Sequence, residues 1–190
     1  MQKLIEHARC FTGDADLHRL AGGQSPLALF ITCSDSRVIP SLFTGARPGE
    51  LFELRTAGNI VPRYRLDRPS GEAATIEFAV EVLGVADIVV CGHSHCGAVG
   101  AMTRGDDLSA VPALREWLAT STPLPGAAPG GEAADAAQRH VLNQTARLLE
   151  YPGLRERVAG GRLGLHAWYY RVHTGAVLAH DPGARAFLPL

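Results

Sequence analysis

The sequence predicts an α/β fold in which helices flank a central, mostly parallel β-sheet. Two short apolar runs, residues 27–32 and 87–91, are rich in β-branched and aromatic side chains and are too short for helices, so we expect buried strands there. Alternating residues at 51–55 predict another strand, and a helical repeat of apolar residues follows at 71–83. Because strand, helix and strand succeed one another, a right-handed parallel crossover is predicted.

The N-terminal region is expected to lie outside this sheet. Apolar residues spaced along positions 1–21, with a break at Thr12-Gly13-Asp14, predict two short helices that are available to pack on a partner subunit. Helices elsewhere are indicated by apolar spacing, by proline at a first helical position and by glycine or proline after the last turn. They are expected at residues 40–43, 97–102, 112–118, 132–150 and 154–158.

The C-terminal part is predicted to complete the sheet. Residues 163–172 and 176–180 flank His173-Thr174-Gly175 and are expected to be two strands joined by a tight turn. Residues 120–131, which are rich in proline, glycine and alanine, are expected to form a surface loop and not a domain boundary. We therefore expect residues 1–190 to form a single domain.

Composition narrows the classes of function. The net charge of −1 and the charged fraction of 19% give no electrostatic reason to expect nucleic acid or an anionic membrane as a partner. No stretch resembles a signal peptide, and no run reaches about 18 apolar residues, so a cytoplasmic location is expected. A chain of this length does not need disulfides, and its four cysteines are better used as thiols.

Metal-binding side chains follow the two buried runs. Cys33 follows the first, and His93 and Cys96 follow the second. Because the carboxyl ends of parallel strands are where open α/β sheets bind ligands, these side chains are expected to meet. Two thiolates and an imidazole suit Zn²⁺, and three protein ligands leave one position open, as in a catalytic site. One Zn²⁺ per chain is expected.

Two other residues compete for these positions. Cys91 and His93 are two apart and share a face of a strand, but Cys91 lies inside the apolar run, where a thiol usually behaves as a small core residue. His95 is adjacent to Cys96, so the two side chains should diverge, whereas His93 and Cys96 are three apart at a turn. Spacing favours Cys96 over Cys91 and His93 over His95, and it leaves both alternatives open.

Asp35 and Arg37 are expected to form an ion pair beside the metal. Residues two apart in an extended turn face the same way, so the guanidinium can hold the carboxylate through two parallel hydrogen bonds and keep it ionised. An aimed carboxylate can orient an attacking oxygen. The alternative is a loop salt bridge without chemical consequence, which is common for this spacing but less expected beside a metal-binding cysteine.

These motifs resemble those of the β-class carbonic anhydrases. The resemblance rests on C33-S-D-S-R37 and H93-S-H-C96, extends through residues 48–59 and 71–80, and covers most of residues 20–105. It implies Cys33, His93 and Cys96 as zinc ligands and Asp35 and Arg37 as a catalytic pair. It further implies a homodimer or homotetramer, because sites of this family are built at a subunit boundary.

The resemblance also implies substrate-binding residues. Gln24 matches a glutamine that hydrogen-bonds substrate across the subunit boundary, and Phe52, Ala57 and Phe78 match an apolar cleft for CO₂. Phe78 replaces a tyrosine of some members, which leaves the proton relay open. Gly97 begins a helix whose N-terminal amides would face the site and favour an anion. Periodicity alone favours core roles for the two phenylalanines, and it leaves a turn role for Gln24 equally open.

A subclass of the family has a closed site in which Asp35 would be a fourth ligand and Arg37 would be released. Arg55 and Tyr170 match the anion pocket of that subclass, but Phe30 stands where it has tryptophan, so we expect an open site. The implied function is reversible hydration of CO₂ to bicarbonate and a proton. Two rivals are a hydrolase of carbon disulfide or carbonyl sulfide on the same fold, and a non-catalytic zinc or thiol sensor with a fourth protein ligand.

Overall fold

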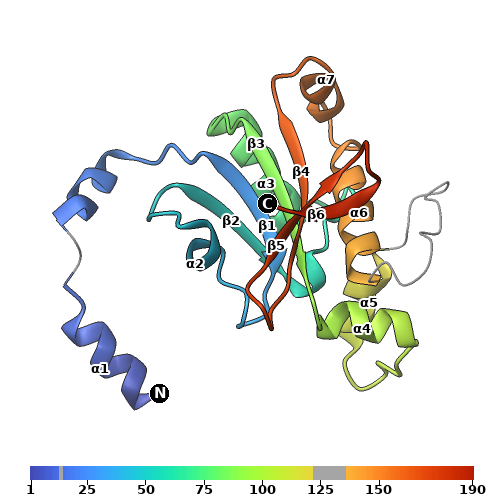
Figure 1. Cartoon of the computed structure of the whole chain (residues 1–190), viewed down its shortest axis with the longest axis horizontal. Helices are drawn as coiled ribbons and strands as arrows, with labels where there is room; N and C mark the ends of the chain where they lie inside the picture. Colours follow the sequence, from blue (N-terminus) through green and yellow to red (C-terminus); the bar gives the residue numbers. More distant parts are fainter. Residues whose placement is uncertain (13–14, 122–135) are drawn as a thin grey trace.

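The computed structural model describes residues 1–12, 15–121 and 136–190. A six-stranded sheet runs through it in the order β2-β1-β3-β4-β5-β6 (Figure 1). The strands are β1 Ala28–Cys33, β2 Leu51–Thr56, β3 Asp87–His93, β4 Gly164–Tyr170, β5 Val177–Asp181 and β6 Ala186–Pro189. The pairs among β2, β1, β3 and β4 are parallel, and β5 and β6 add antiparallel strands at one edge. The predicted mostly parallel α/β fold is therefore confirmed.

Helical segments lie between and outside these strands. They are α1 Gln2–Cys10, η1 Ala15–Gly22, α2 Pro40–Thr44, η2 Ala57–Asn59, α3 Gly71–Glu77, η3 Phe78–Val82, α4 Gly97–Arg104, α5 Pro112–Ala119, α6 Ala136–Leu148 and α7 Leu154–Ala159. The helix expected over 71–83 begins as α3, capped by Ser70, and continues as a π-helical turn in η3. Within the described residues, no helix is long and apolar enough to span a membrane.

Alternating side chains bury both faces of the central strands. On one face, Leu29, Ile31 and Ile88 pack with α3 and α6 in the main core. On the other face, Phe30 packs against Phe43 of α2 and Trp168 of β4. Burial on both sides explains why β1 and β3 read as continuous apolar runs in the sequence.

Several predicted boundaries shift in the structure. Strand β3 extends through His93, two residues beyond the predicted end, because its backbone pairs with β4 as far as Tyr170. The short edge strand β6 was not predicted, since its half-exposed residues and Pro189 give little periodic signal. The predicted loop at 120–131 lies largely outside the described residues, as do the break at 13–14 and the start of the helix predicted at 132–150.

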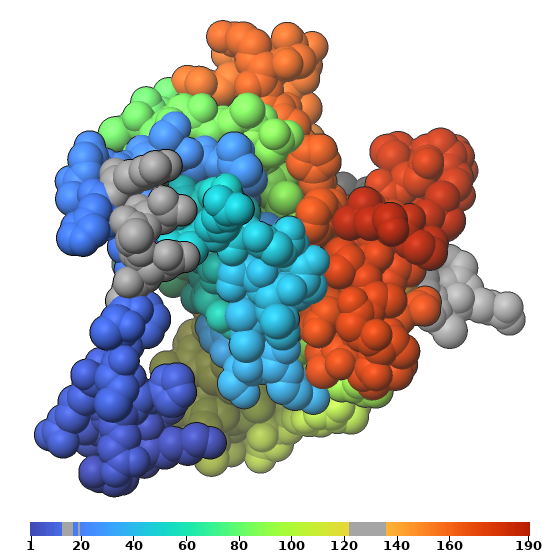
Figure 2. Space-filling model, turned by 60° about the vertical axis from the view of Figure 1, so that its left-hand side comes forward, coloured from blue at the N-terminus to red at the C-terminus, as the bar shows by residue number. Residues whose placement is uncertain are grey.

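The N-terminal helix α1 projects from the rest of the molecule. None of its residues is buried, and Leu4 within it and Phe11 directly after it, at 67% and 70% exposed, leave apolar surface open to solvent. Figure 2 shows α1 as a separate lobe beside the main body. A helix of nine residues with none of them buried is marginal on its own in water.

Helix α6 packs directly on the backbone of β3 at Gly92. A Cβ built on Gly92 would collide with the side chain of Val141. We therefore expect Gly92→Ala to lower the free energy of unfolding by roughly 1–3 kcal/mol through overpacking. Urea unfolding of Gly92→Ala, Val141→Ala and the double variant measures this. If the clash is the cause, the double variant loses less than the two single losses added together; simple additivity would contradict it.

Candidate metal centre

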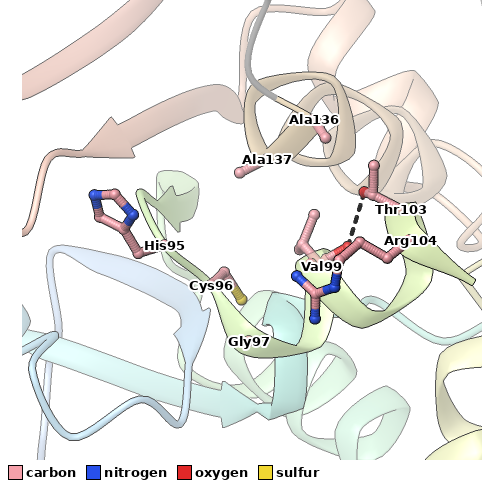
Figure 3. Close-up of a pocket in the computed structure, with 9 residues that line it drawn as sticks. His95, Cys96, Gly97, Val99, Thr103, Arg104, Ala136 and Ala137 are labelled. Atoms are coloured by element: carbon pink, nitrogen blue, oxygen red, sulfur yellow. Dashed lines mark hydrogen bonds between the residues drawn. The ribbon is translucent and has the colours of Figure 1, made fainter. Parts of the chain in front are cut away.

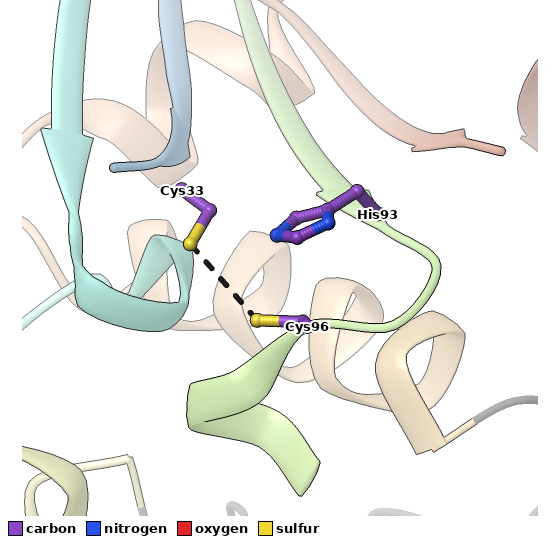
Figure 4. A group of neighbouring side chains, drawn as sticks. All are labelled: Cys33, His93 and Cys96. Atoms are coloured by element: carbon purple, nitrogen blue, oxygen red, sulfur yellow. Dashed lines mark hydrogen bonds between the residues drawn. The ribbon is translucent and has the colours of Figure 1, made fainter. Parts of the chain in front are cut away.

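Three buried side chains converge at the carboxyl end of the sheet. The ligand atoms of Cys33, His93 and Cys96 lie within 4.8 Å of one another, and the two sulfurs are 3.9 Å apart. Cys33 is the last residue of β1, His93 is the last residue of β3, and Cys96 caps the N-terminus of α4. Figure 4 shows the His93 ring directed toward the two sulfurs. Among the described residues, no fourth cysteine, histidine or acidic side chain joins this group.

The state of His93 fits a metal ligand. Its Nδ1 lies 3.0 Å from the carbonyl oxygen of Ser94, so Nδ1 carries the proton and donates it. That tautomer leaves a lone pair on Nε2, which is buried without a hydrogen-bond partner. An unpaired buried nitrogen is costly, and an imidazole nitrogen beside two sulfurs is the donor set that zinc takes with one open position. The residues present therefore fit Zn²⁺.

The two sulfurs influence each other's ionisation. The hydrogen bond from Cys96 lowers the pKa of the Cys33 thiol to about 4 against the opposing effect of burial, and the Gly58 amide adds to the lowering. The pKa of Cys96 is raised, first because its thiol donates to Cys33 and then by burial. Without a cation, the pair therefore holds one thiolate and one proton. A divalent cation stabilises both thiolates together.

Arg37 holds Asp35 beside this cluster. Its Nε donates to Oδ1 at 2.9 Å and its Nη2 donates to Oδ2 at 2.7 Å, while the Arg37 amide adds a third bond to Oδ1. The Arg37 guanidinium thereby holds the pKa of Asp35 well below its usual range. Oδ2 lies 3.9 Å from Nε2 of His93, so an ionised carboxylate faces the metal position without belonging to the ligand cluster.

Arg55 supports the loop that carries these residues. From β2, its guanidinium donates to the carbonyl oxygens of Cys33, Asp35 and Val38, at 3.0, 3.0 and 2.6 Å. The family resemblance of the sequence suggested that Arg55 and Tyr170 form an anion pocket. In this structure the donors of Arg55 serve the loop, and Tyr170 stacks on Phe43. This supporting role has no local sequence signal, because the partners are backbone atoms distant along the chain.

The competing residues lie elsewhere. Cys91 is fully buried among the apolar residues of the opposite sheet face, and burial raises the pKa of its thiol to about 12. His95 is exposed, with its backbone in the left-handed region at φ +57°, and its ring contacts His173 at 5.6 Å between centroids. Its carbonyl oxygen accepts a hydrogen bond from Arg37. Neither side chain belongs to the cluster.

A hollow of about 410 Å³ borders the cluster at Cys96 and Gly97 (Figure 3). It is lined by α4 and the start of α6, and Gly97 opens α4 as predicted. The other proposed substrate residues lie apart from it. Gln24 is on the exposed segment before β1, Ala57 is half-buried after β2, and Phe52 contacts Phe78 at 5.9 Å between ring centroids. The chain alone does not gather all of these residues around the sulfurs.

Metal content tests the ligand assignment. We expect Cys96→Ala to lose bound zinc, since it removes one of three ligands, whereas Cys91→Ala keeps one zinc per chain because Cys91 faces the core. Elemental analysis of the purified variants measures the stoichiometry. Zinc retained by Cys96→Ala and lost by Cys91→Ala would reverse the assignment.

Comparisons with known proteins identify the family of the chain. The chain matches the family described as carbonic anhydrase over residues 28–177. It is 47% identical to a carbonic anhydrase of Pseudomonas aeruginosa, covering 90% of this chain and 80% of that protein, and 40% identical to carbonic anhydrase 1 of Escherichia coli O157:H7, covering 93% and 84%. Its fold matches the β-carbonic anhydrase CcaA with a TM-score of 0.87 at 36% identity, covering 100% and 99% of the two chains. The chain therefore belongs to the β-class carbonic anhydrases, zinc-dependent lyases that interconvert carbon dioxide and bicarbonate.

Proposed function

We propose that five side chains divide the work of CO₂ hydration. Cys33, His93 and Cys96 hold the zinc, and Asp35 and Arg37 orient the reacting water. Zinc, when bound, supplies the Lewis acidity that makes hydroxide available near neutral pH. The observation that supports this division is the position of Asp35, held by Arg37 and facing His93 Nε2 at 3.9 Å.

Asp35 acts by accepting a hydrogen bond. Its pKa stays well below the usual range because Arg37 hydrogen-bonds both carboxylate oxygens, so the group remains an acceptor throughout the neutral range. A carboxylate oxygen that accepts the hydrogen of the attacking oxygen leaves a lone pair of that oxygen free for the CO₂ carbon. Arg37 acts on the same step by fixing the carboxylate.

We also propose that this site is of the open kind. A closed form needs Asp35 to leave Arg37, and three hydrogen bonds oppose that movement. The Arg55 guanidinium adds a further restraint, because it holds the carbonyl oxygen of Asp35 itself. An open coordination position also distinguishes an enzyme from a zinc sensor, in which a fourth protein ligand would close the metal.

We further propose a homodimer of single-domain chains, or a tetramer built from such dimers. Phe52 lies four residues before the carboxyl end of β2, which is about 13 Å along the strand, so it is remote from its own Cys33. Phe52, together with Phe78 and Gln24, is therefore proposed to serve the site of the partner subunit. A tetrameric assembly is stated for β-carbonic anhydrases of Sordaria macrospora that share this fold, with a TM-score of 0.71 at 29% identity.

A cytoplasmic location is part of the same proposal. The site needs both thiolates, and sulfurs 3.9 Å apart lie close enough to form a disulfide under oxidising conditions after a small movement. A reducing compartment keeps the thiols of Cys33 and Cys96 available to the metal.

Asp35→Asn tests the proposed catalytic pair. The amide keeps the size of the side chain but removes the charge and turns an acceptor into a donor, so kcat/KM for CO₂ hydration should fall about a hundredfold or more. Stopped-flow hydration across pH, with zinc content measured in parallel, gives the answer. Full activity with zinc retained would remove Asp35 from the mechanism. Parallel assays of carbonyl sulfide and carbon disulfide hydrolysis test the alternative that the protein is a hydrolase of these compounds.

Charged substitutions on α1 and at Phe11, the residue after it, test whether this segment takes part in subunit association. Leu4→Glu with Phe11→Glu should shift the protein to the monomer mass in light scattering after size exclusion, since both side chains are exposed and apolar in the single chain. Leu190→Glu is the matched control, because Leu190 is 71% exposed at the other end of the chain. An unchanged mass in the α1 variant would contradict a role of this helix in association.

A further inference from the structure

A backbone amide donates to one of the metal-binding sulfurs. The N–H of Gly58 lies 3.4 Å from Sγ of Cys33, in the short helical turn η2 that follows β2. Gly58 is buried with φ +76°, a conformation that glycine adopts without the cost a side chain would add. A Cβ there would also lie 3.2 Å from Cβ of Ala98, a tight contact, so both the backbone conformation and the space favour glycine at this position.

The peptide group that contains this N–H is held from its other end. Nε1 of Trp117, on α5, donates to the carbonyl oxygen of Ala57 at 2.9 Å. That carbonyl and the Gly58 N–H belong to one peptide group. A hydrogen bond to the carbonyl therefore fixes the plane of the peptide and also polarises its N–H, which strengthens the bond to the sulfur.

The next peptide group is held as well. Nε2 of His140, on α6, donates to the carbonyl oxygen of Gly58 at 2.7 Å. His140 is buried, and burial lowers its pKa, so the neutral ring with its proton on Nε2 fits this contact. Both peptide groups that flank Gly58 thus receive a side-chain donor from a separate helix. Neither Trp117 nor His140 belongs to the cluster of metal-binding side chains.

We propose that Trp117 and His140 are positioning residues that hold the Gly58 N–H on the Cys33 sulfur and so tune its bond to zinc. The proposal rests on the assignment of Cys33 as a zinc ligand. Two thiolates give a zinc ion much negative charge and weaken its acidity toward water. A hydrogen bond to a thiolate withdraws part of that charge, and partners that orient ligands in this way commonly alter metal affinity 10–100-fold.

Trp117→Phe is the direct test, because it removes the donor and keeps an aromatic ring in the cluster with Ile60 and Leu118. In the Co²⁺-substituted protein, the sulfur-to-metal charge-transfer band should move to longer wavelength, since the sulfur electrons are less stabilised. Zinc affinity, measured by competition with a chelator, should fall about tenfold. The amide proton of Gly58 should move upfield in the NMR spectrum.

Tyr151→Phe is the matched control. The Tyr151 hydroxyl donates to the carbonyl oxygen of Pro62, so its loss also removes a donor to the segment after β2, but at a peptide group that does not reach the sulfur. The control should leave the charge-transfer band in place even where both variants unfold at lower urea concentration. Equal spectra and equal zinc affinities in the two variants would overturn the role of Trp117.

Two substitutions examine His140 in the same way. His140→Gln keeps an N–H within reach of the Gly58 carbonyl oxygen, whereas His140→Leu does not, so only the leucine variant should shift the band. A leucine variant identical to the wild type would remove His140 from the proposal. Failure of the ligand assignment itself has a different signature, because the wild-type Co²⁺ protein would then lack a sulfur-to-metal band altogether.

Discussion

The parallel pairing of β1 with β3 is the constraint on which the rest of the site depends. Their register sets Thr32 opposite Cys91, so the two strands end at nearly the same level and present Cys33 and His93 side by side. A slip of one residue would turn each side chain to the other face of the sheet. The register is secured because both strands are buried on both faces. Any slip would move apolar side chains out of the positions into which they pack and place side chains of other shapes there.

Charge balance explains why the loop after β1 is so heavily hydrogen-bonded. In the proposed site, two thiolates and the Asp35 carboxylate would place three negative charges near one divalent ion. Arg37 offsets one charge directly, and the N-terminal amides of α4 and the Gly58 N–H direct partial positive charge at the sulfurs. Arg55 adds its own charge while fixing the carbonyls of the loop. The groups that neutralise the site also hold its geometry.

The single chain brings together the polar residues of the proposed site, whereas the apolar residues proposed for it lie elsewhere. Phe52 and Phe78 form a pair on the β2 side of the sheet, where β2 is also an edge strand. An edge strand leaves unpaired backbone groups, and covering it with another chain is one way proteins protect such an edge. The exposed apolar face of α1 adds surface that gains from association. In the proposed assembly, the same subunit contact completes the site and covers the edge strand β2.

The side-chain groupings that can be predicted from the sequence are those whose spacing reflects local geometry. Asp35 and Arg37 are two apart in a turn, and His93 and Cys96 are three apart at a strand end, so their pairing follows from the chain itself. The edge strand β6 had too little burial to leave a pattern.

The residues that bind distant backbone atoms leave no pattern either. Arg55 donates to carbonyl oxygens 17 to 22 residues away along the chain, Trp117 to one 60 residues away and His140 to one 82 residues away. Any residue can present a carbonyl oxygen, so no residue type marks the acceptor and no spacing marks the pair. Contacts of this kind become visible only when the fold has placed the helices, which is why the proposed ligands could be inferred from the sequence and their proposed supports only from the fold.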